Sequence, residues 1–174
     1  MTTYFYSDPP SLKYRIVVNM INLFQSKYAV QRDLLKNKFP VPSYDINKSV
    51  LKYKIQFNSP VYGFDVHHLS NSDPEPITVL YLHGGGHISG SMKIHYDFLN
   101  KLIDVLNVNV IVPDYPLLPE YTYQDTLQMI EETYLSILQD YPDHKIILMG
   151  DSAGGSLSLA LYLKLKQLRK RLPD

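Results

Sequence analysis

The chain has 174 residues, with 17 lysines and arginines against 17 aspartates and glutamates, and it has no cysteine. This length fits one domain, and the ordinary apolar content allows a sizeable core. The charge balance argues against binding of nucleic acid or an anionic membrane surface. The lack of cysteine excludes disulfides, thiolate metal sites and a cysteine nucleophile. We therefore expect a small-molecule partner, and neither a metal nor a cofactor.

The first residues lack the pattern of a targeting peptide. No basic stretch followed by an apolar run occurs at residues 1–10, and Asn19 and Asn22 interrupt the apolar stretch 16–24. The sequence thus predicts no membrane span and, by default, a cytoplasmic protein. Apolar residues recur at helical spacing between Ser11 and about Lys36, which predicts one or two helices in front of the main domain.

The main domain is predicted to open with an antiparallel hairpin. Apolar and polar residues alternate over 51–57, a turn is expected at Asn58–Pro60, and the alternation continues over 62–66. Near-continuous apolar runs and helical patterns then follow in turn: strands at 77–82, 108–112 and 146–149, and helices at 94–105, 127–138 and from about Ser152. Strands alternating with helices predict an α/β fold with a mostly parallel sheet.

The junction between the last predicted strand and the last predicted helix reads Gly150-Asp151-Ser152-Ala153-Gly154-Gly155. A Gly-x-Ser-x-Gly turn at such a junction presents a nucleophilic hydroxyl, because small residues let the chain turn sharply. The N–H group of Ala153 opens the helix and points to the same place, where the helix dipole favours negative charge. This pattern predicts a serine nucleophile that attacks a carbonyl group.

A second motif follows the strand that ends at Leu82 and reads His83-Gly84-Gly85-Gly86. Glycines let the backbone approach a ligand and present N–H groups to the oxyanion of a tetrahedral intermediate. In esterases a loop at this position supplies oxyanion donors. Either motif alone is a modest signal, but here both follow a predicted strand and come in the right order. We expect His83 to fix this loop.

Together the motifs resemble the hormone-sensitive-lipase-like esterases of the α/β-hydrolases. The segment Asp114–Glu120 is similar to that family's Asp-Tyr-Arg-Leu-Ala-Pro-Glu element, with departures at Pro116 and Leu118, and Ser91 and His95 stand where its members often carry a serine and a histidine. The resemblance covers about 51–174. It implies an α/β-hydrolase fold in two parts: cap helices at 1–45 and the N-terminal part of the hydrolase domain at 46–174.

The resemblance also implies a carboxylic ester hydrolase that works through an acyl-enzyme on Ser152. The N–H groups of Gly85, Gly86 and Ala153 would form the oxyanion hole, and Gly84 would form the turn. Asp151 is interpreted as a small polar residue of the turn, Asp114 as shaping its loop, and Glu120 and Asp125 as capping or beginning a helix. The family's general base and orienting acid lie on later loops, whereas no histidine follows Ser152 here.

We therefore expect the N-terminal part of a longer or split esterase, weakly active or inactive alone. The apolar strand at 146–149 would have an unpaired side, to be covered by a complementing chain or by self-association. Two alternatives stay open: a small-molecule binding module similar to the gibberellin receptors, and half of a two-chain hydrolase. A rewired triad would need a histidine already present, and the candidates are His67, His68, His83, His87, His95 and His144.

Overall fold

The computed structural model describes residues 11, 36, 40–45, 54–61 and 63–174, and for 54–61 it describes the backbone alone. The chain divides into two units, Met1–Phe39 and Pro40–Asp174. The helices predicted between Ser11 and Lys36 lie outside the described residues, as does the start of the first predicted strand. All the helices and strands described below belong to the second unit, Pro40–Asp174.

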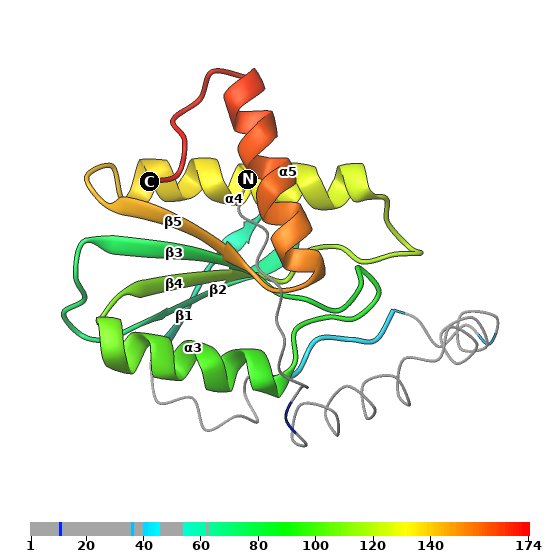
Figure 1. The fold of residues 1–174 in the computed structure, drawn as a ribbon, viewed down its shortest axis with the longest axis horizontal. Helices are drawn as coiled ribbons and strands as arrows, with labels where there is room; N and C mark the ends of the chain where they lie inside the picture. The colour runs from blue at the N-terminus through cyan, green and yellow to red at the C-terminus, as the bar shows by residue number, and fades with distance from the viewer. Residues whose placement is uncertain (1–10, 12–35, 37–39, 46–53, 62) are drawn as a thin grey trace. The chain divides into compact units, whose positions relative to one another are not determined.

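The described part of this unit is a five-stranded mixed sheet with helices on both faces (Figure 1). Its elements are β1 (Lys54–Val61), β2 (Phe64–Ser70), β3 (Ile77–Leu82), α3 (Lys93–Leu106), β4 (Asn109–Pro113), α4 (Tyr123–Asp140), β5 (Lys145–Gly150) and α5 (Ala153–Gln167). The strand order is β1-β2-β4-β3-β5. β1, β2 and β4 pair antiparallel, whereas β3 pairs parallel with both β4 and β5. The predicted α/β fold is confirmed.

The turn of the hairpin lies further along the chain than predicted. β1 continues through Asn58–Pro60, where the register against β2 shifts, and the chain reverses near Gly63, whose φ is +81°. Glycine adopts a positive φ at little cost, so it forms this turn better than the proline-containing segment does. The alternating pattern indicated the hairpin, but the register irregularity was not visible in it.

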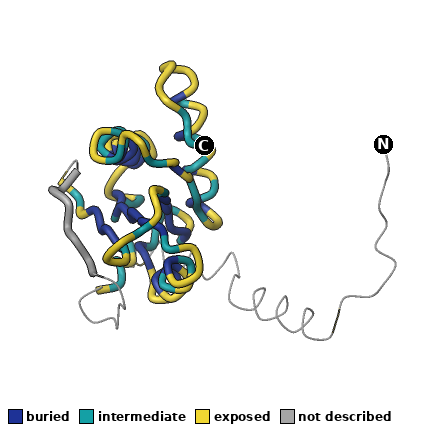
Figure 2. The backbone as a smooth tube through the Cα atoms, turned by 90° about the vertical axis from the view of Figure 1, so that its left-hand side faces the viewer, coloured by how far each residue is buried: buried dark blue, intermediate teal, exposed yellow. Residues whose placement is uncertain are grey.

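Two hydrophobic clusters hold the layers together. α4 and α5 cover one face of the sheet, where Leu80, Ile111 and Ile146 are fully buried, and α3 covers the other, where Val79 and Val110 are buried (Figure 1). Neighbouring strand residues belong to opposite clusters because side chains alternate across a strand. Figure 2 shows the buried backbone of the strands between the outer layers. The first turns of α5 are buried, as predicted.

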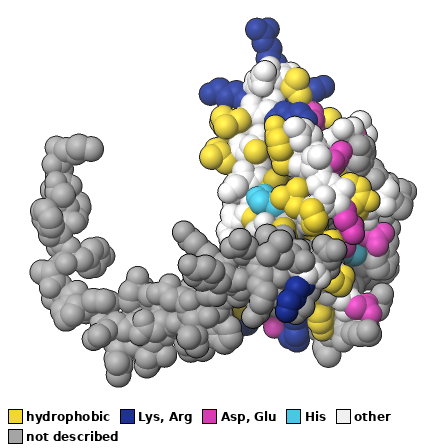
Figure 3. Space-filling model, turned by 90° about the vertical axis from the view of Figure 1, so that its right-hand side faces the viewer, with side chains coloured by type: hydrophobic (Ala, Val, Ile, Leu, Met, Phe, Trp, Pro, Cys, Tyr) yellow, Lys and Arg dark blue, Asp and Glu magenta, His cyan; other side chains and the backbone are white. Residues whose placement is uncertain are grey.

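The parallel strands all end at the same side of the sheet, which positions the candidate site. The segments after β3, β4 and β5 meet there because parallel strands share one direction, and crevices at such strand ends are common ligand sites. Figure 3 faces this side and shows exposed hydrophobic side chains with histidine among them. Within the residues that the structure describes, no helix has the length and apolar character needed to span a membrane.

Candidate active site

Ser152 lies in a sharp turn between β5 and α5 and adopts an unusual backbone conformation. Its φ is +49° and its ψ is −117°, a region that serine rarely occupies and that costs about 1–3 kcal/mol. Ser152 is exposed at the N-cap position of α5, yet its side chain makes no capping hydrogen bond. The turn therefore presents the Ser152 hydroxyl to solvent instead of using it to stabilise the helix.

Two glycines make this turn possible. A Cβ atom on Gly150 would lie 2.5 Å from the carbonyl carbon of Gly154, and one on Gly154 would lie 2.6 Å from the carbonyl carbon of Leu82. Real Cβ atoms essentially never come this close to backbone. The start of α5 thus packs directly on the ends of β5 and β3. The spacing Gly150-x-Ser152-x-Gly154 predicted the sharp turn but not this packing.

The glycine segment after β3 forms a compact loop. Gly85 has a φ of +128° and Gly86 a φ of +63°, and the Gly85 carbonyl accepts hydrogen bonds from the N–H groups of Ile88 and Ser89 at 3.2 and 3.1 Å. Both φ values lie where L residues are disfavoured. Gly85 and Gly86 are thus needed for the path of the loop.

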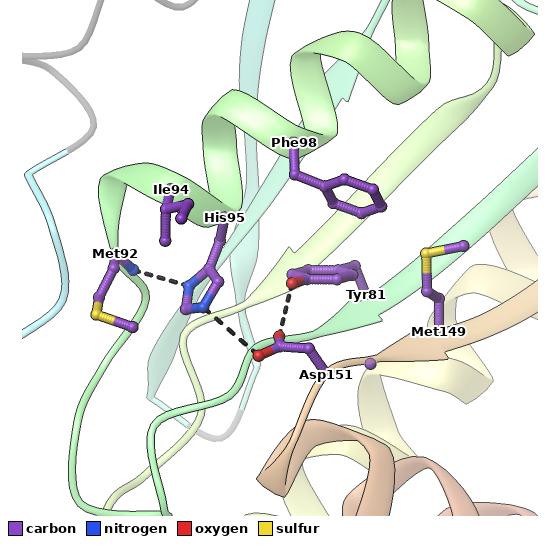
Figure 4. A pocket seen from close by; sticks show the side chains of 8 residues that line it. Tyr81, Met92, Ile94, His95, Phe98, Met149 and Asp151 are labelled. Atoms are coloured by element: carbon purple, nitrogen blue, oxygen red, sulfur yellow. Dashed lines mark hydrogen bonds and ion pairs between the residues drawn. The ribbon is translucent and has the colours of Figure 1, made fainter. Parts of the chain in front are cut away.

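Asp151 joins the glycine loop to the turn at Ser152. Its Oδ1 accepts a hydrogen bond from the Gly84 N–H group at 2.8 Å. It accepts another from the Tyr81 hydroxyl at 2.7 Å (Figure 4). Burial, together with the hydrogen bond to Asp151, raises the pKa of Tyr81, so this hydroxyl stays protonated and donates. The two sequence motifs, 67 positions apart, therefore meet through the residue next to Ser152.

His95, on the first turn of α3, contacts the same carboxylate. Its Nδ1 accepts a hydrogen bond from the Met92 N–H group at 2.9 Å, and its Nε2 lies 3.8 Å from Asp151 Oδ2 (Figure 4). Because Nδ1 is an acceptor, the proton of a neutral ring lies on Nε2, the nitrogen that faces Asp151. His95 is thus oriented toward Asp151.

His83 stabilises the loop from inside the fold, as expected. Its Nδ1 lies 2.8 Å from the carbonyl oxygen of Gly84, and its ring stacks on Tyr115 with centroids 4.2 Å apart and on His95 at 5.9 Å. Burial is the main cause that lowers the pKa of His83, with partial compensation from the Gly84 carbonyl. A neutral, fully buried ring suits a structural role.

The other candidate histidines lie elsewhere or contact other groups. His68 pairs with Asn109 at 3.2 Å, and His144 contacts Thr78 at 2.9 Å. Asn109 and Thr78 lie where β4 and β3 begin, so these two histidines are at the end of the sheet away from Ser152. His67 is on β2 opposite Val112, and His87 is on the glycine loop with a φ of +63°. His83 contacts Gly84 and His95 contacts Asp151, so both lie against residues next to the two motifs.

Residues 40–45, placed by the sequence with the cap, lie beside the end of the glycine loop. Val41 forms a parallel bridge with Ser89, and the Tyr44 N–H group donates to the Ser91 carbonyl at 2.7 Å. The Ser43 hydroxyl donates to Asp114, which connects this segment to the loop after β4. Asp114 therefore shapes its loop, as expected. Asp125 caps α4 together with Thr122, also as expected, whereas Glu120 lies before that helix.

Sequence reasoning missed the part played by Asp151 and Tyr81. Asp151 was interpreted only as a small polar residue of the turn, and Tyr81 was not singled out within its apolar strand. A carboxylate beside the candidate nucleophile and a hydroxyl near the end of β3 were the available signals. Their meeting depends on β3 and β5 being neighbours in register, with Tyr81 opposite Met149.

Loss of the Asp151 carboxylate is expected to destabilise the fold. Asp151→Ala leaves the Gly84 N–H and Tyr81 hydroxyl groups without their acceptor, and we expect a loss of about 1–2 kcal/mol because the carboxylate is half exposed. Urea unfolding measures this loss of stability. Asp97→Ala is the matched control, since the exposed ion pair between Asp97 and Lys93 contributes about 0.5 kcal/mol or less. Equal losses in the two variants would contradict the role of Asp151.

Stability is expected to fall as the pH falls below about 6.5, the unfolded-state pKa of histidine. Burial lowers the pKa of His67, His68, His83 and His95 in the folded chain, so below pH 6.5 the unfolded chain binds protons that the folded chain resists. Above pH 6.5 these histidines are neutral in both states, so their contribution to stability is fully present. His83 alone makes the unfolding free energy fall by at most about 1.4 kcal/mol for each pH unit below 6.5.

Urea unfolding at pH 7.5, 6.5 and 5.5 measures this dependence. The His83→Phe variant keeps an aromatic ring against Tyr115 but binds no proton, so its unfolding free energy should fall less steeply with decreasing pH. If the unfolding free energy falls equally with pH in the wild-type chain and in His83→Phe, then His83 titrates alike in the folded and unfolded states. That result would contradict the prediction.

The chain is similar in sequence to known hydrolases. Residues 79–174 match the model of a family described as alpha/beta hydrolase fold. An esterase from Acinetobacter venetianus is 36% identical over 97 residues, which cover 55% of this chain and 32% of that protein. The Mycobacterium tuberculosis carboxylesterase/phospholipase LipF is 35% identical over 89 residues, 51% of this chain and 24% of that protein.

A solved structure shows the same likeness in three dimensions. An esterase from the bacterial hormone-sensitive lipase family superposes with a TM-score of 0.63 at 30% identity, covering 74% of this chain and 44% of the other. The matched part thus spans a third or less of these curated relatives and under half of that solved chain. The expected resemblance to the hormone-sensitive-lipase-like esterases is confirmed. The family model matches more than half of the residues of this chain, so the chain belongs to the alpha/beta hydrolase family.

Proposed function

We propose that the protein is the nucleophile-bearing part of a carboxylic ester hydrolase that forms an acyl-enzyme on Ser152. One observation carries the proposal: Ser152 is held at a φ of +49° at the start of α5, with a hydroxyl that caps nothing. A strained backbone at an exposed serine is typical of a nucleophile turn, where the fold maintains the strain because it aims the hydroxyl. The contact of Asp151 with Gly84 supports the proposal by bringing the oxyanion loop to this turn.

The proposed reaction begins when the Ser152 oxygen attacks the ester carbonyl. The tetrahedral oxyanion would be stabilised by the N–H groups of Gly85, Gly86 and Ala153, and by the dipole of α5. The N–H groups of Gly154 and Gly155 donate to the carbonyl of Asp151. Ala153 is the first residue of α5, so its N–H group has no acceptor within the helix. Collapse of the intermediate releases the alcohol, and water then hydrolyses the acyl-serine ester.

A general base must accept the Ser152 proton and return it to the leaving alcohol. The two histidines nearest the site are engaged with other groups: His83 with Gly84 and Tyr115, and His95 with Met92 and Asp151. We therefore propose that the base and its orienting acid come from the part of the fold that the matched relatives possess beyond this chain. The chain alone would be weakly active or inactive.

The proposed substrates are carboxylic esters of short to medium acyl chains, cleaved without a metal or cofactor. The names of the relatives, an esterase and a carboxylesterase/phospholipase, support this class. The test is hydrolysis of p-nitrophenyl acetate and butyrate by the chain alone and by the chain joined to the remainder of the Acinetobacter venetianus esterase. Turnover only by the joined protein is the expected result. Rapid turnover by the chain alone would overturn the proposed missing base.

A further inference from the structure

Residues 40–45, called the strap below, are bonded along one side of the end of the glycine loop. The Val41 N–H group donates to the Ile88 carbonyl at 2.9 Å, and the Val41 carbonyl accepts a hydrogen bond from the Gly90 N–H group at 2.8 Å. This is the pattern of a parallel bridge, here between Val41 and Ser89. Both backbone groups of Val41 are therefore bonded to the loop.

A single hydroxyl joins the strap to the loop and to the sheet. The Ser43 hydroxyl accepts a hydrogen bond from the Ser91 N–H group at 3.3 Å and donates one to the Asp114 carboxylate. Asp114 directly follows β4, and its N–H group donates to the Asp65 carbonyl of β2 at 2.9 Å. The strap is thus connected through Ser43 to residues that two paired strands hold in place.

The strap and the loop pack in direct contact. A Cβ atom on Gly90 would lie 2.6 Å from both the Cα and the N atom of Ser43, a distance that real Cβ atoms essentially never show. Gly90 is therefore required for space and not for a positive φ. On the other side, the half-buried Tyr44 packs against the hydrophobic cluster under α3, with its ring 6.5 Å from that of Tyr96. The strap is thus seated on the loop and anchored in the core.

Ile88 connects the strap to the two glycines with positive φ. Its carbonyl accepts from Val41, while its own N–H group and that of Ser89 donate to the Gly85 carbonyl. The Gly85 carbonyl and the Gly86 N–H group belong to one planar trans peptide, so the two groups point in opposite directions. The bonds to the Gly85 carbonyl therefore aim the Gly86 N–H group, which is one of the proposed oxyanion donors.

The glycine pair needs such support at both ends. Glycine has more backbone freedom to lose on folding than any other residue, so consecutive glycines keep an N–H group in one direction only where neighbouring bonds fix it. Before the pair, the Gly84 N–H group is held by Asp151. After the pair, the His87 carbonyl accepts from the Leu118 N–H group at 2.8 Å, and the strap makes the bonds described above.

We propose that the strap positions the oxyanion loop, with the Ser43 hydroxyl and the Val41 backbone as its positioning groups. They hold the end of the glycine loop and so aim the Gly86 N–H group at the oxygen of the ester carbonyl. Both groups act through the loop and not on the substrate. The inference rests on the proposed function, because the role of the Gly86 N–H group belongs to that proposal. Its first test therefore reads the loop itself, independently of catalysis.

NMR of the 174-residue chain measures hydrogen exchange of the loop amides and, through residual dipolar couplings, the direction of the Gly86 N–H group. In Ser43→Ala we expect the N–H groups of Ile88 and Ser89 to exchange about tenfold or more faster than in the wild type, and the Gly86 direction to change. Exchange at Leu80, fully buried in β3, reports global unfolding and should rise less. Equal increases at all three amides would make Ser43 a contributor to overall stability alone and overturn the proposal, as would an unchanged loop.

Matched variants separate the backbone of the strap from its side chains. Val41→Pro removes the N–H group that donates to Ile88, and residue 41 already precedes a proline, which confines it to extended backbone. Val41→Ala keeps this N–H group and changes a side chain that is 41% exposed. Only Val41→Pro should release the Ile88 amide as Ser43→Ala does, and equal exchange in the two Val41 variants would overturn the proposal. Ser89→Ala is the serine control, because the Ser89 hydroxyl bonds within its own loop, at 3.4 Å.

Steady-state kinetics of the joined protein measure the catalytic consequence. Loss of one oxyanion donor lowers kcat by about 10²- to 10³-fold, and a misaimed donor should cost less. For p-nitrophenyl butyrate we therefore expect Ser43→Ala to lower kcat about tenfold and to change KM less than about twofold. A loss confined to KM, or an unchanged kcat beside a released loop, would overturn the positioning role. An inactive wild-type joined protein would refute the proposed function, while faster exchange of the Ile88 amide in the variants would still support the hold of the strap on the loop.

Discussion

Ser152→Ala is expected to lower kcat for p-nitrophenyl butyrate by about 10⁴- to 10⁶-fold in the joined protein, because the acyl-enzyme cannot form without the hydroxyl. The proposed oxyanion donors remain in this variant, so a residual acceleration of roughly 10³-fold over water is expected. Steady-state kinetics with the ester measure kcat and KM. KM should change little, since the Ser152 hydroxyl contributes mainly to the chemical step.

Two measurements separate the loss of chemistry from loss of fold. The Ser152 hydroxyl caps nothing, so Ser152→Ala should leave the free energy of unfolding nearly unchanged. Ser152→Gly should be equally inactive but more stable by about 1 kcal/mol, because glycine adopts a positive φ without strain. A fluorophosphonate should label the wild-type joined protein at Ser152 and neither variant. Retained turnover in Ser152→Ala would refute the assignment of the nucleophile.

Gly154→Ala is expected to destabilise the protein by about 3 kcal/mol or more, which is the upper part of the range for overpacking. The added methyl group would lie 2.6 Å from the carbonyl carbon of Leu82 and 2.8 Å from the carbonyl oxygen of His83. Both are backbone atoms at the end of β3 and cannot rotate away. α5 would have to move off the sheet, taking Leu157 and Leu161 out of the core. Urea unfolding of the 174-residue chain measures the effect.

Gly155→Ala provides a control one residue away. Its methyl group would meet the Gly150 carbonyl oxygen at 3.5 Å, which is ordinary contact, and Gly155 lies inside α5. Alanine is the better helix former, so this variant should be more stable by about 0.5–1 kcal/mol. Opposite signs at adjacent glycines are the expected result. A similar small effect at both positions would show that α5 does not pack closely on the end of β3.

Much of the site was predictable because its geometry is local. A strand followed within two residues by a helix forces a tight turn, and Gly150 and Gly154 are recognisable as the positions where no side chain fits. The same holds for the glycine loop, where positive φ values at Gly85 and Gly86 require glycine. Periodicity likewise indicated β3, β4, β5 and the three described helices, because burial on one face imposes a repeat on the residues themselves.

Contacts between distant residues were not predictable in this way. The role of Asp151 depends on Gly84 and Tyr81, which reach it only because β3 and β5 are neighbours, although α3, β4 and α4 lie between them in sequence. The hairpin turn at Gly63 depends on a register shift that alternation does not reveal. In both cases the deciding interaction is a backbone or polar contact across the sheet.

The amino-acid sequence by itself determined the class of fold, the nucleophile candidate and the glycine loop, since each depends on residues close together in the chain. Only the tertiary structure decided which acceptor joins the two motifs, which histidines lie beside them, and that the Asp174 N–H group donates to the Ile146 carbonyl of β5. Those features depend on strand order and register, which arise from the packing of the whole sheet and leave no mark on any single segment.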